Sequence, residues 1–249
     1  MIIKTLVKKI TKNEFSTNKE TRDNFIKETL EKIPKGARIL DAGAGELRNK
    51  KLCTHLNYVS QDFCQYDGKG DNAGLQTKSW DTLKIDIIGD ITNIPEKDGA
   101  FDVILCSEVF EHLPNPIDAI KEFQRLLKKD GILIITAPFC SLTHFSPYHF
   151  STGFNRYFYE HHLKYFGFDI EQISTNGNFF QFLGQEILRM PNVVDTYTSK
   201  KASIFDKFIM ILTLKVLQRF SKYDKGSDEL LCYGYHVVAK KISKNINES

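Results

Sequence analysis

Polar turns that follow short apolar runs carry the residues of this chain that are best suited to chemistry. The first such turn is the run DAGAG, which begins at Asp41. Its carboxylate offers a partner to a cation, and Gly43 and Gly45 would let backbone amides approach a ligand closely. A dinucleotide site favours a third glycine where Arg48 stands, and it has no need of an acid at the turn. The turn therefore favours a positively charged ligand over an anionic pyrophosphate.

Two further aspartates offer hydrogen-bond acceptors that suit a nucleoside. Asp62 lies 21 residues after Asp41, and its carboxylate can accept hydrogen bonds from both hydroxyls of a ribose. Asp90 can accept one from an adenine amino group while Ile91 covers the ring, although an aspartate before Ile-Thr can also simply cap a turn. Together these residues fit an adenosyl sulfonium compound with a free ammonium group.

Buried strands alternating with helices must position these turns. Apolar residues at helical spacing predict helices over 20–33, within an N-terminal helical segment, 1–35, and over 116–129. The 21-residue interval after Asp41 predicts one more helix. Short apolar runs predict strands at 38–42, 58–60, 101–106 and 131–136. This alternation indicates an α/β fold with a parallel sheet covered on both faces, and the polar turns should meet at one edge of it.

The second half of the chain adds a loop and an insertion. Residues 139–160 are aromatic and histidine-rich, which predicts a long substrate loop over the carboxyl edge of the sheet. A helix over 158–167 and a strand over 168–173 should follow, with a last strand over 233–240. Residues 184–230 then form a helical insertion before that last strand.

A helix predicted at 203–223, inside the insertion, has one apolar face. Its residues are Phe205, Ile209, Leu212, Val216 and Phe220. Packing against the domain or against a second copy of the chain would bury this face. Because lysines lie beside it, docking to a membrane surface is the alternative. We expect one domain over 1–249.

Composition excludes several classes of protein. The formal net charge is only +3, too small a surplus to predict binding of nucleic acid. The five cysteines contain no C-x-x-C pair, and His161-His162 has no acidic or cysteine partner at ligand spacing, so no metal site is predicted. Cysteine usage, the absence of a signal-peptide pattern and the lack of a long uncharged apolar stretch together predict a soluble, cytoplasmic protein.

The turns at the strand ends resemble those of the class I S-adenosylmethionine-dependent methyltransferases, over residues 36–175. The matching positions are Asp41, Gly43 and Gly45 in the family's first motif, Asp62 as its ribose acid, Asp90 with Ile91 on the adenine side, and Cys106 to His112 as its fourth-strand motif, S-E-V-x-E-H. The resemblance implies a doubly wound, mostly parallel, seven-stranded Rossmann-like sheet. It also implies S-adenosylmethionine as cofactor, bound in part by Ser107, and S-adenosylhomocysteine as product. Leu47 departs from the pattern, because it stands where the family has its third glycine.

The segment from His144 to Tyr157 resembles one found in methyltransferases of bacterial polysaccharide gene clusters, with the pattern H-x-x-P followed by (F/Y)-x-R-(F/Y). This resemblance implies O-methylation of a small sugar or a phosphate-linked precursor, for example a phosphoramidate, in capsule or surface polysaccharide biosynthesis. Tyr148, Arg156 and His112 are then expected to bind the acceptor, although Arg156 could instead pair with a loop carboxylate.

Methyl transfer to a hydroxyl requires aligned reactants and a group that takes the hydroxyl proton. His144, His149 and Glu108 are the candidates for this base, followed by His112, which with Glu111 could instead close the turn after the strand. An amine acceptor would react in its neutral form, so N-methylation stays open, as does a lipid-linked acceptor. A non-catalytic nucleotide-binding module and a nicotinamide-dependent oxidoreductase are the rival hypotheses from other classes.

Overall fold

The structure, a computed structural model, describes residues 14–242 and divides them into two compact units. The sheet unit comprises residues 24–174 and 234–242, and the helical unit comprises residues 14–23 and 175–233. The residues predicted as a helical insertion, 184–230, fall in the helical unit together with residues 14–23, and the single domain over 1–249 stays a prediction.

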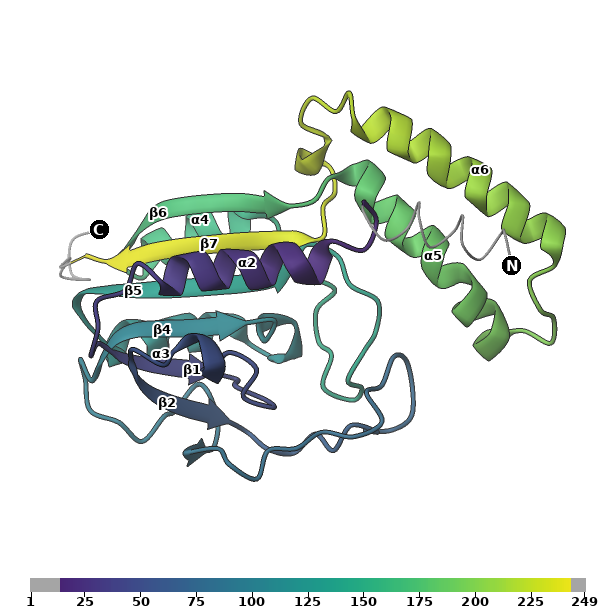
Figure 1. Cartoon of the computed structure of the whole chain (residues 1–249). Helices are drawn as coiled ribbons and strands as arrows, with labels where there is room; N and C mark the ends of the chain where they lie inside the picture. The colour runs from purple at the N-terminus through teal and green to yellow at the C-terminus, as the bar shows by residue number, and fades with distance from the viewer. Residues whose placement is uncertain (1–13, 243–249) are drawn as a thin grey trace. The chain divides into compact units, whose positions relative to one another are not determined.

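The sheet has seven strands in the order β3-β2-β1-β4-β5-β7-β6 (Figure 1). From β3 to β5 the neighbouring strands are parallel, and β7 runs antiparallel to β5. The strands are β1 (Arg38–Ala42), β2 (Asn57–Asp62), β3 (Ile87–Ile88), β4 (Phe101–Ser107), β5 (Leu127–Pro138), β6 (Phe168–Asn176) and β7 (Gly234–Lys241). This topology confirms the doubly wound, mostly parallel α/β fold, and its strand order reverses between β1 and β4.

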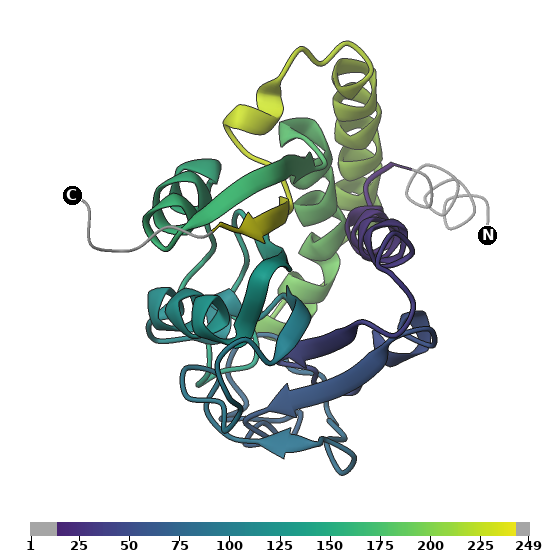
Figure 2. The same ribbon diagram turned by 90° about the vertical axis from the view of Figure 1, so that its left-hand side faces the viewer.

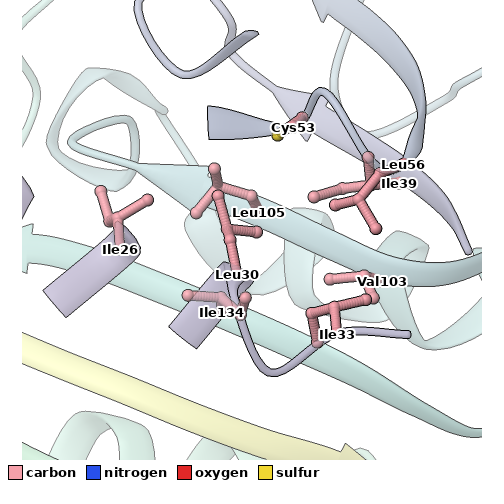
Figure 3. Packing of buried hydrophobic residues seen from close by; sticks show 9 residues of the cluster. All are labelled: Ile26, Leu30, Ile33, Ile39, Cys53, Leu56, Val103, Leu105 and Ile134. Atoms are coloured by element: carbon pink, nitrogen blue, oxygen red, sulfur yellow. The ribbon is translucent and has the colours of Figure 1, made fainter. Parts of the chain in front are cut away.

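The central strands are almost continuous apolar runs, as expected for a parallel sheet that is covered on both faces. One core cluster joins helix α2 (Asn18–Leu30) to three of these strands and to the connection between β1 and β2. Its nine buried residues, drawn in Figure 3, are Ile26, Leu30, Ile33, Ile39, Cys53, Leu56, Val103, Leu105 and Ile134. Burying one large aliphatic side chain stabilises a fold by about 1.5–3 kcal/mol. The cluster therefore holds α2 against β1, β4 and β5 of the sheet.

Helices lie on both sides of the sheet, with α2 on one side and α3 (Pro116–Leu126) and α4 (Arg156–Tyr165) on the other (Figure 2). Of the N-terminal segment predicted over 1–35, residues 1–13 lie outside the described residues. The sequence predicted that α3 continues to Lys129. It ends at Leu126 because Leu127 already pairs with Phe101 as the first residue of β5.

The connection between β1 and β2 differs from the prediction. A full helix was expected there, and the structure has only a 3₁₀ turn, η1 (Lys50–Leu52). Leu47 explains part of this difference, because its φ of 57° places it in the left-handed region and prevents a right-handed helix from starting at that point. The glycine turn is therefore followed by a compact irregular segment.

The helical unit is built on two long helices, α5 (Phe179–Tyr197) and α6 (Ile204–Ser221). Each begins with a capping box, formed by Asn178 in α5 and Ser203 in α6. α5 starts five residues before the insertion predicted at 184–230. Gly184, the first residue of the predicted insertion, therefore lies inside this helix. A Cβ on Gly184 would lie 2.2 Å from the Phe15 ring, so glycine permits the close contact of the two segments.

The outward face of α6 is apolar and exposed. Ile211, Leu214 and Leu217 turn inward and are buried within the helical unit. The exposed residues are Ile204, Phe205, Phe208, Ile209, Leu212, Val216 and Phe220. Among residues 14–242, no helix is long and apolar enough to cross a membrane. An exposed face of this kind is what either predicted partner, a second copy of the chain or a membrane surface, would require.

Candidate active site

The candidate site lies at the carboxyl edge of the sheet. Asp41 and Asp62 stand at the ends of β1 and β2, and Ser107 is the last residue of β4. These strands are parallel neighbours, so their carboxyl ends meet at the same edge. The structure therefore brings together the turns that the sequence singled out, at the point where the strand order reverses.

Asp41 is a buried carboxylate with a defined orientation. Its Oδ2 accepts a hydrogen bond from the Tyr58 hydroxyl at 2.7 Å, and its Oδ1 lies 3.5 Å from the Asn49 side-chain nitrogen. Burial raises the pKa of Asp41 to about 6, although these hydrogen bonds oppose the shift. A cation bound beside it would stabilise the charged carboxylate, so the site is suited to an ammonium group.

The glycine turn is held tightly between β2 and β4. Gly43 has φ +75°, and a Cβ there would lie 2.4 Å from a methyl carbon of Val109, so only glycine fits. The Asp62 carboxylate accepts the amide hydrogen bonds of Gly45, at 2.9 Å, and of Cys64, at 2.8 Å. Since a carboxylate has about four acceptor sites, Asp62 can bind a ribose while it holds the turn.

Asp90 and Ile91 follow β3, on the same edge of the sheet. The amide of Gly89 donates to the Asp62 carbonyl at 3.1 Å, which holds this segment beside β2. Asp90 Oδ1 accepts from both the amide and the hydroxyl of Thr92, each at 2.8 Å, so it caps a turn. Ile91 is buried. The side chain of Asp90 is exposed, and both of these hydrogen bonds use the same carboxylate oxygen.

The turn after β4 holds a chain of polar side chains. Ser107 Oγ lies 2.8 Å from Thr136 Oγ1, which donates to Glu108 Oε1 at 3.0 Å. Glu108 has φ 57°, a left-handed conformation that costs free energy for a residue with a side chain. The hydrogen bonds through Thr136 orient the Ser107 and Glu108 side chains at the end of the strand.

The loop after β5 brings its histidines to the same turn. The amides of Phe150 and Ser151 donate to the Glu111 carbonyl at 2.9 and 3.2 Å, which fixes the loop to η2 (Phe110–His112). The ring of His144 lies 4.7 Å from that of His112 and 4.8 Å from that of His149, measured between centroids. The sequence could not show that these three rings form one cluster.

Burial sets the protonation of two of these histidines. It lowers the pKa of His112 to about 3, with the neighbouring His144 as the second cause. The pKa of His149 is also lowered, first by burial and then by His144, and its Nε2 lies 3.1 Å from the Ser141 hydroxyl. Both rings are therefore neutral near pH 7.

A cluster of three aromatic residues contacts the glycine turn through Trp80, and no sequence pattern indicated a role for them. The Phe145 ring stacks on Tyr66 at 4.5 Å and meets the edge of Trp80 at 5.2 Å. A Cβ on Gly45 would lie 2.6 Å from the Trp80 ring. Trp80 is the single tryptophan of the chain, which was the one available signal.

The two remaining residues predicted to bind an acceptor have different settings. The Tyr148 ring packs edge-on against Phe63, at 5.0 Å between centroids, and its carbonyl oxygen contacts His112 Nδ1 at 2.6 Å. Arg156 begins α4, where it contacts the Tyr157 hydroxyl at 3.1 Å and Glu160 at 4.0 Å. Tyr148 thus contacts the histidine cluster, and Arg156 contacts a carboxylate of its own helix, not one of the loop.

A protein-family model described as a methyltransferase domain matches residues 16–173, which is more than half of the chain. The chain belongs to this methyltransferase family. The family identity and the sheet confirm the class I S-adenosylmethionine-dependent methyltransferase that the sequence motifs implied. An S-adenosylmethionine-dependent methyltransferase from Archaeoglobus fulgidus has the same fold, with a TM-score of 0.53 at 15% identity, covering 89% of this chain and 94% of the other.

Two sequence relatives match shorter parts of this methyltransferase. The protein MJ0638 of Methanocaldococcus jannaschii is 31% identical over 136 residues, which are 47% of this chain and 60% of the relative. A ubiquinone biosynthesis O-methyltransferase from Glaesserella parasuis is 53% identical over 36 residues, which are 14% of this chain and 15% of the relative. This methyltransferase thus spans less than two thirds of either relative's length.

S-adenosylmethionine is the cofactor of this methyltransferase family, and the residues at the sheet edge fit it. Asp41, Asp62 and Asp90 supply three acceptors, which the ammonium, ribose and adenine groups of the cofactor require. Gly43 leaves the backbone free of a Cβ at the turn between them. The donor set and the turn therefore agree with the family's cofactor.

Proposed function

We propose that this methyltransferase transfers a methyl group to a hydroxyl of a small acceptor. The acceptor class that we propose is a sugar or a phosphate-linked precursor, such as a phosphoramidate, of bacterial capsule or surface polysaccharide. Support for this class comes from the resemblance of residues 144–157 to enzymes of polysaccharide gene clusters. Arg156, with Tyr148 and His112, would bind the acceptor.

The attachment of the histidine loop to the turn after β4 carries this proposal. Hydrogen bonds from Phe150 and Ser151 to the Glu111 carbonyl hold His144 and His149 next to the strand end where the cofactor-binding turns meet. A hydroxyl must lose its proton during transfer, and a positioned imidazole can accept it. Such a cluster would be unnecessary for an acceptor that reacts as a neutral amine.

The roles of the cofactor-binding residues follow from their positions. We propose that Asp41 binds the ammonium group, Asp62 the ribose, and Asp90 with Ile91 the adenine. Gly43 and Gly45 have no side chain, so the backbone of the turn can approach the cofactor closely. S-adenosylmethionine supplies a methyl group bonded to positively charged sulfur. Ser107 and Glu108 border the reacting end. There the acceptor oxygen bonds to the methyl carbon as the bond from that carbon to sulfur breaks, which leaves S-adenosylhomocysteine, and the acceptor proton passes to a histidine of the loop.

Asp41→Asn should weaken cofactor binding and at the same time raise the stability of the fold. The folded-state pKa of about 6 lies above the ordinary 3.8, so the charged form of Asp41 is disfavoured in the folded protein. Stability is therefore lost as the pH rises toward 6, and at pH 7.5 the variant should be more stable by about 1–3 kcal/mol. It should also bind S-adenosylmethionine at least tenfold more weakly, since a charge-assisted contact contributes about 1.5–3 kcal/mol.

Urea unfolding and calorimetric titration across pH 5–8 would measure both effects. In the wild-type protein the affinity for S-adenosylmethionine should fall below about pH 6 as Asp41 takes up a proton. In the variant this pH dependence should disappear. Equal affinities at pH 7.5 would contradict the ammonium role of Asp41.

The proposed function is tested by turnover with S-adenosylmethionine and a panel of acceptors. The panel should contain sugars, sugar phosphates, a phosphoramidate, primary amines and a polyprenyl-linked sugar. We expect release of S-adenosylhomocysteine with the hydroxylated acceptors, and mass spectrometry should place the methyl group on oxygen. A methyl group on nitrogen would instead establish N-methylation, and saturable cofactor binding without any transfer would favour a non-catalytic module.

A further inference from the structure

One group of side chains at the candidate site has the composition of a metal-ligand set. Glu111, His112 and His144 each offer one ligand atom, and these atoms lie within 4.8 Å of one another. Glu111 and His112 come from η2, and His144 comes from the loop after β5. His144 lies more than 30 positions after His112 in the sequence, so no local spacing pattern indicates this set.

The second nitrogen of each histidine fixes the direction of its ring. His112 Nδ1 lies 2.6 Å from the Tyr148 carbonyl oxygen, and His144 Nδ1 lies 2.8 Å from that of Leu142. A carbonyl oxygen only accepts hydrogen bonds, so each Nδ1 must be the donor. In a neutral ring the lone pair is then on Nε2. Metal-binding histidines are typically oriented in this way, by a backbone carbonyl behind the ring.

The distances from the two Nε2 atoms to the Glu111 carboxylate also suit a bound ion. Nε2 of His112 lies 3.7 Å from Glu111 Oε1, and Nε2 of His144 lies 3.8 Å from the same oxygen. These separations exceed those of hydrogen bonds. Two ligands of a tetrahedral zinc ion at about 2.0–2.1 Å from the metal lie about 3.4 Å apart.

We infer that Glu111, His112 and His144 bind a divalent transition-metal ion, for which Zn²⁺ is the best match. Two imidazole nitrogens and one carboxylate suit zinc, whereas Mg²⁺ prefers oxygen ligands alone. The side chain of Glu111 is only 1% exposed, so the set is shielded from bulk water on one side. Three protein ligands leave a position open, as in catalytic zinc sites.

An ion at this position would assign separate roles to the two loop histidines. Bound by Glu111, His112 and His144, it would supply Lewis-acid activation of the acceptor hydroxyl. The proton would pass to His149, whose ring lies beside that of His144, while the oxygen forms its bond to the methyl carbon and the electron pair of the broken bond stays on sulfur. This chemical role rests on the proposed function, but binding of the ion does not.

The test is calorimetric titration of the chelator-treated full-length protein with Zn²⁺. We expect one equivalent to bind. His144→Ala should weaken binding by more than the 10–100-fold that loss of an outer hydrogen-bond partner typically costs. Glu111→Gln keeps the side-chain shape and should also weaken binding. His161→Ala/His162→Ala, which removes an adjacent histidine pair on α4, should leave it unchanged.

A second readout uses Co²⁺, whose visible absorption reports the number and geometry of its ligands, and Mg²⁺ serves as the comparison ion. Loss of the visible bands in His144→Ala, with unchanged affinity for S-adenosylhomocysteine, would support the inference. Equal zinc binding by wild type, His144→Ala and Glu111→Gln would overturn it. If methyl transfer proceeds at full rate after chelation and no ion binds, the metal inference fails while the proposed function stands. If zinc binds to these residues but no acceptor is methylated, the metal inference stands and the proposed function fails.

Discussion

Replacing His149 with alanine is expected to lower kcat for a hydroxylated acceptor by about 10²–10⁴-fold, the range over which general bases contribute. His149 lies in the loop that the Glu111 carbonyl holds against η2, and its ring is next to that of His144. Because it is not one of the cofactor-binding residues, the affinity for S-adenosylhomocysteine should remain within twofold or so of wild type. Steady-state kinetics together with calorimetry would measure both quantities.

The control for this prediction is His161→Ala, which changes an exposed histidine of α4 and should leave kcat unaltered. His149→Gln, which preserves a polar side chain, should restore little activity if proton acceptance is the role. A kcat that stays close to wild type in His149→Ala would contradict the assignment. His144 would then be the next candidate for the base, followed by Glu108, whose carboxylate accepts a hydrogen bond from Thr136 at the same strand end.

Asp62→Ala should have the second large effect, on both cofactor binding and stability. The substitution removes the acceptor that we assign to the ribose hydroxyls, and loss of such contacts costs about 1–3 kcal/mol, or about 5–150-fold in affinity. It also leaves the amides of Gly45 and Cys64 without the carboxylate that holds the glycine turn. Calorimetry with S-adenosylmethionine and urea unfolding would measure the two losses.

Asp86→Ala is the matched control for Asp62→Ala. Asp86 also accepts two hydrogen bonds, from the amide and the hydroxyl of Ser60, at 2.9 and 2.7 Å. Its replacement should destabilise the fold to a similar degree, but it should not change the affinity for the cofactor. If both variants lost the same affinity, the effect of Asp62 would be one of folding alone, and the ribose assignment would be wrong.

The sheet and its reactive edge could be predicted from the sequence because their signals are local. The apolar run 38–42 is confirmed as β1, and the acid at its end identifies the carboxyl edge. Asp41 and Asp62 come together because β1 and β2 are adjacent parallel strands, a consequence of the alternating pattern. The family motifs added the cofactor, which the family identity confirms.

Other features depend on contacts between distant segments, and the sequence could not supply them. Glu111 meets His144 only because the loop after β5 folds back onto η2. Trp80 covers Gly45 from a segment without periodicity. The absence of the helix expected between β1 and β2 is explained in part by the left-handed conformation of Leu47. The sequence does not indicate this conformation, because leucine, unlike glycine, rarely adopts it.

The two ends of the helical insertion meet. The amide of Tyr233 donates to the carbonyl of Asn176 at 2.8 Å, so the chain leaves the end of β6 and returns to the start of β7 at nearly the same place. A short turn could join these neighbouring strands directly. The 56 residues between them therefore form an excursion whose length is not set by the distance between the two strand ends, so insertions of other lengths could join the same pair of strands.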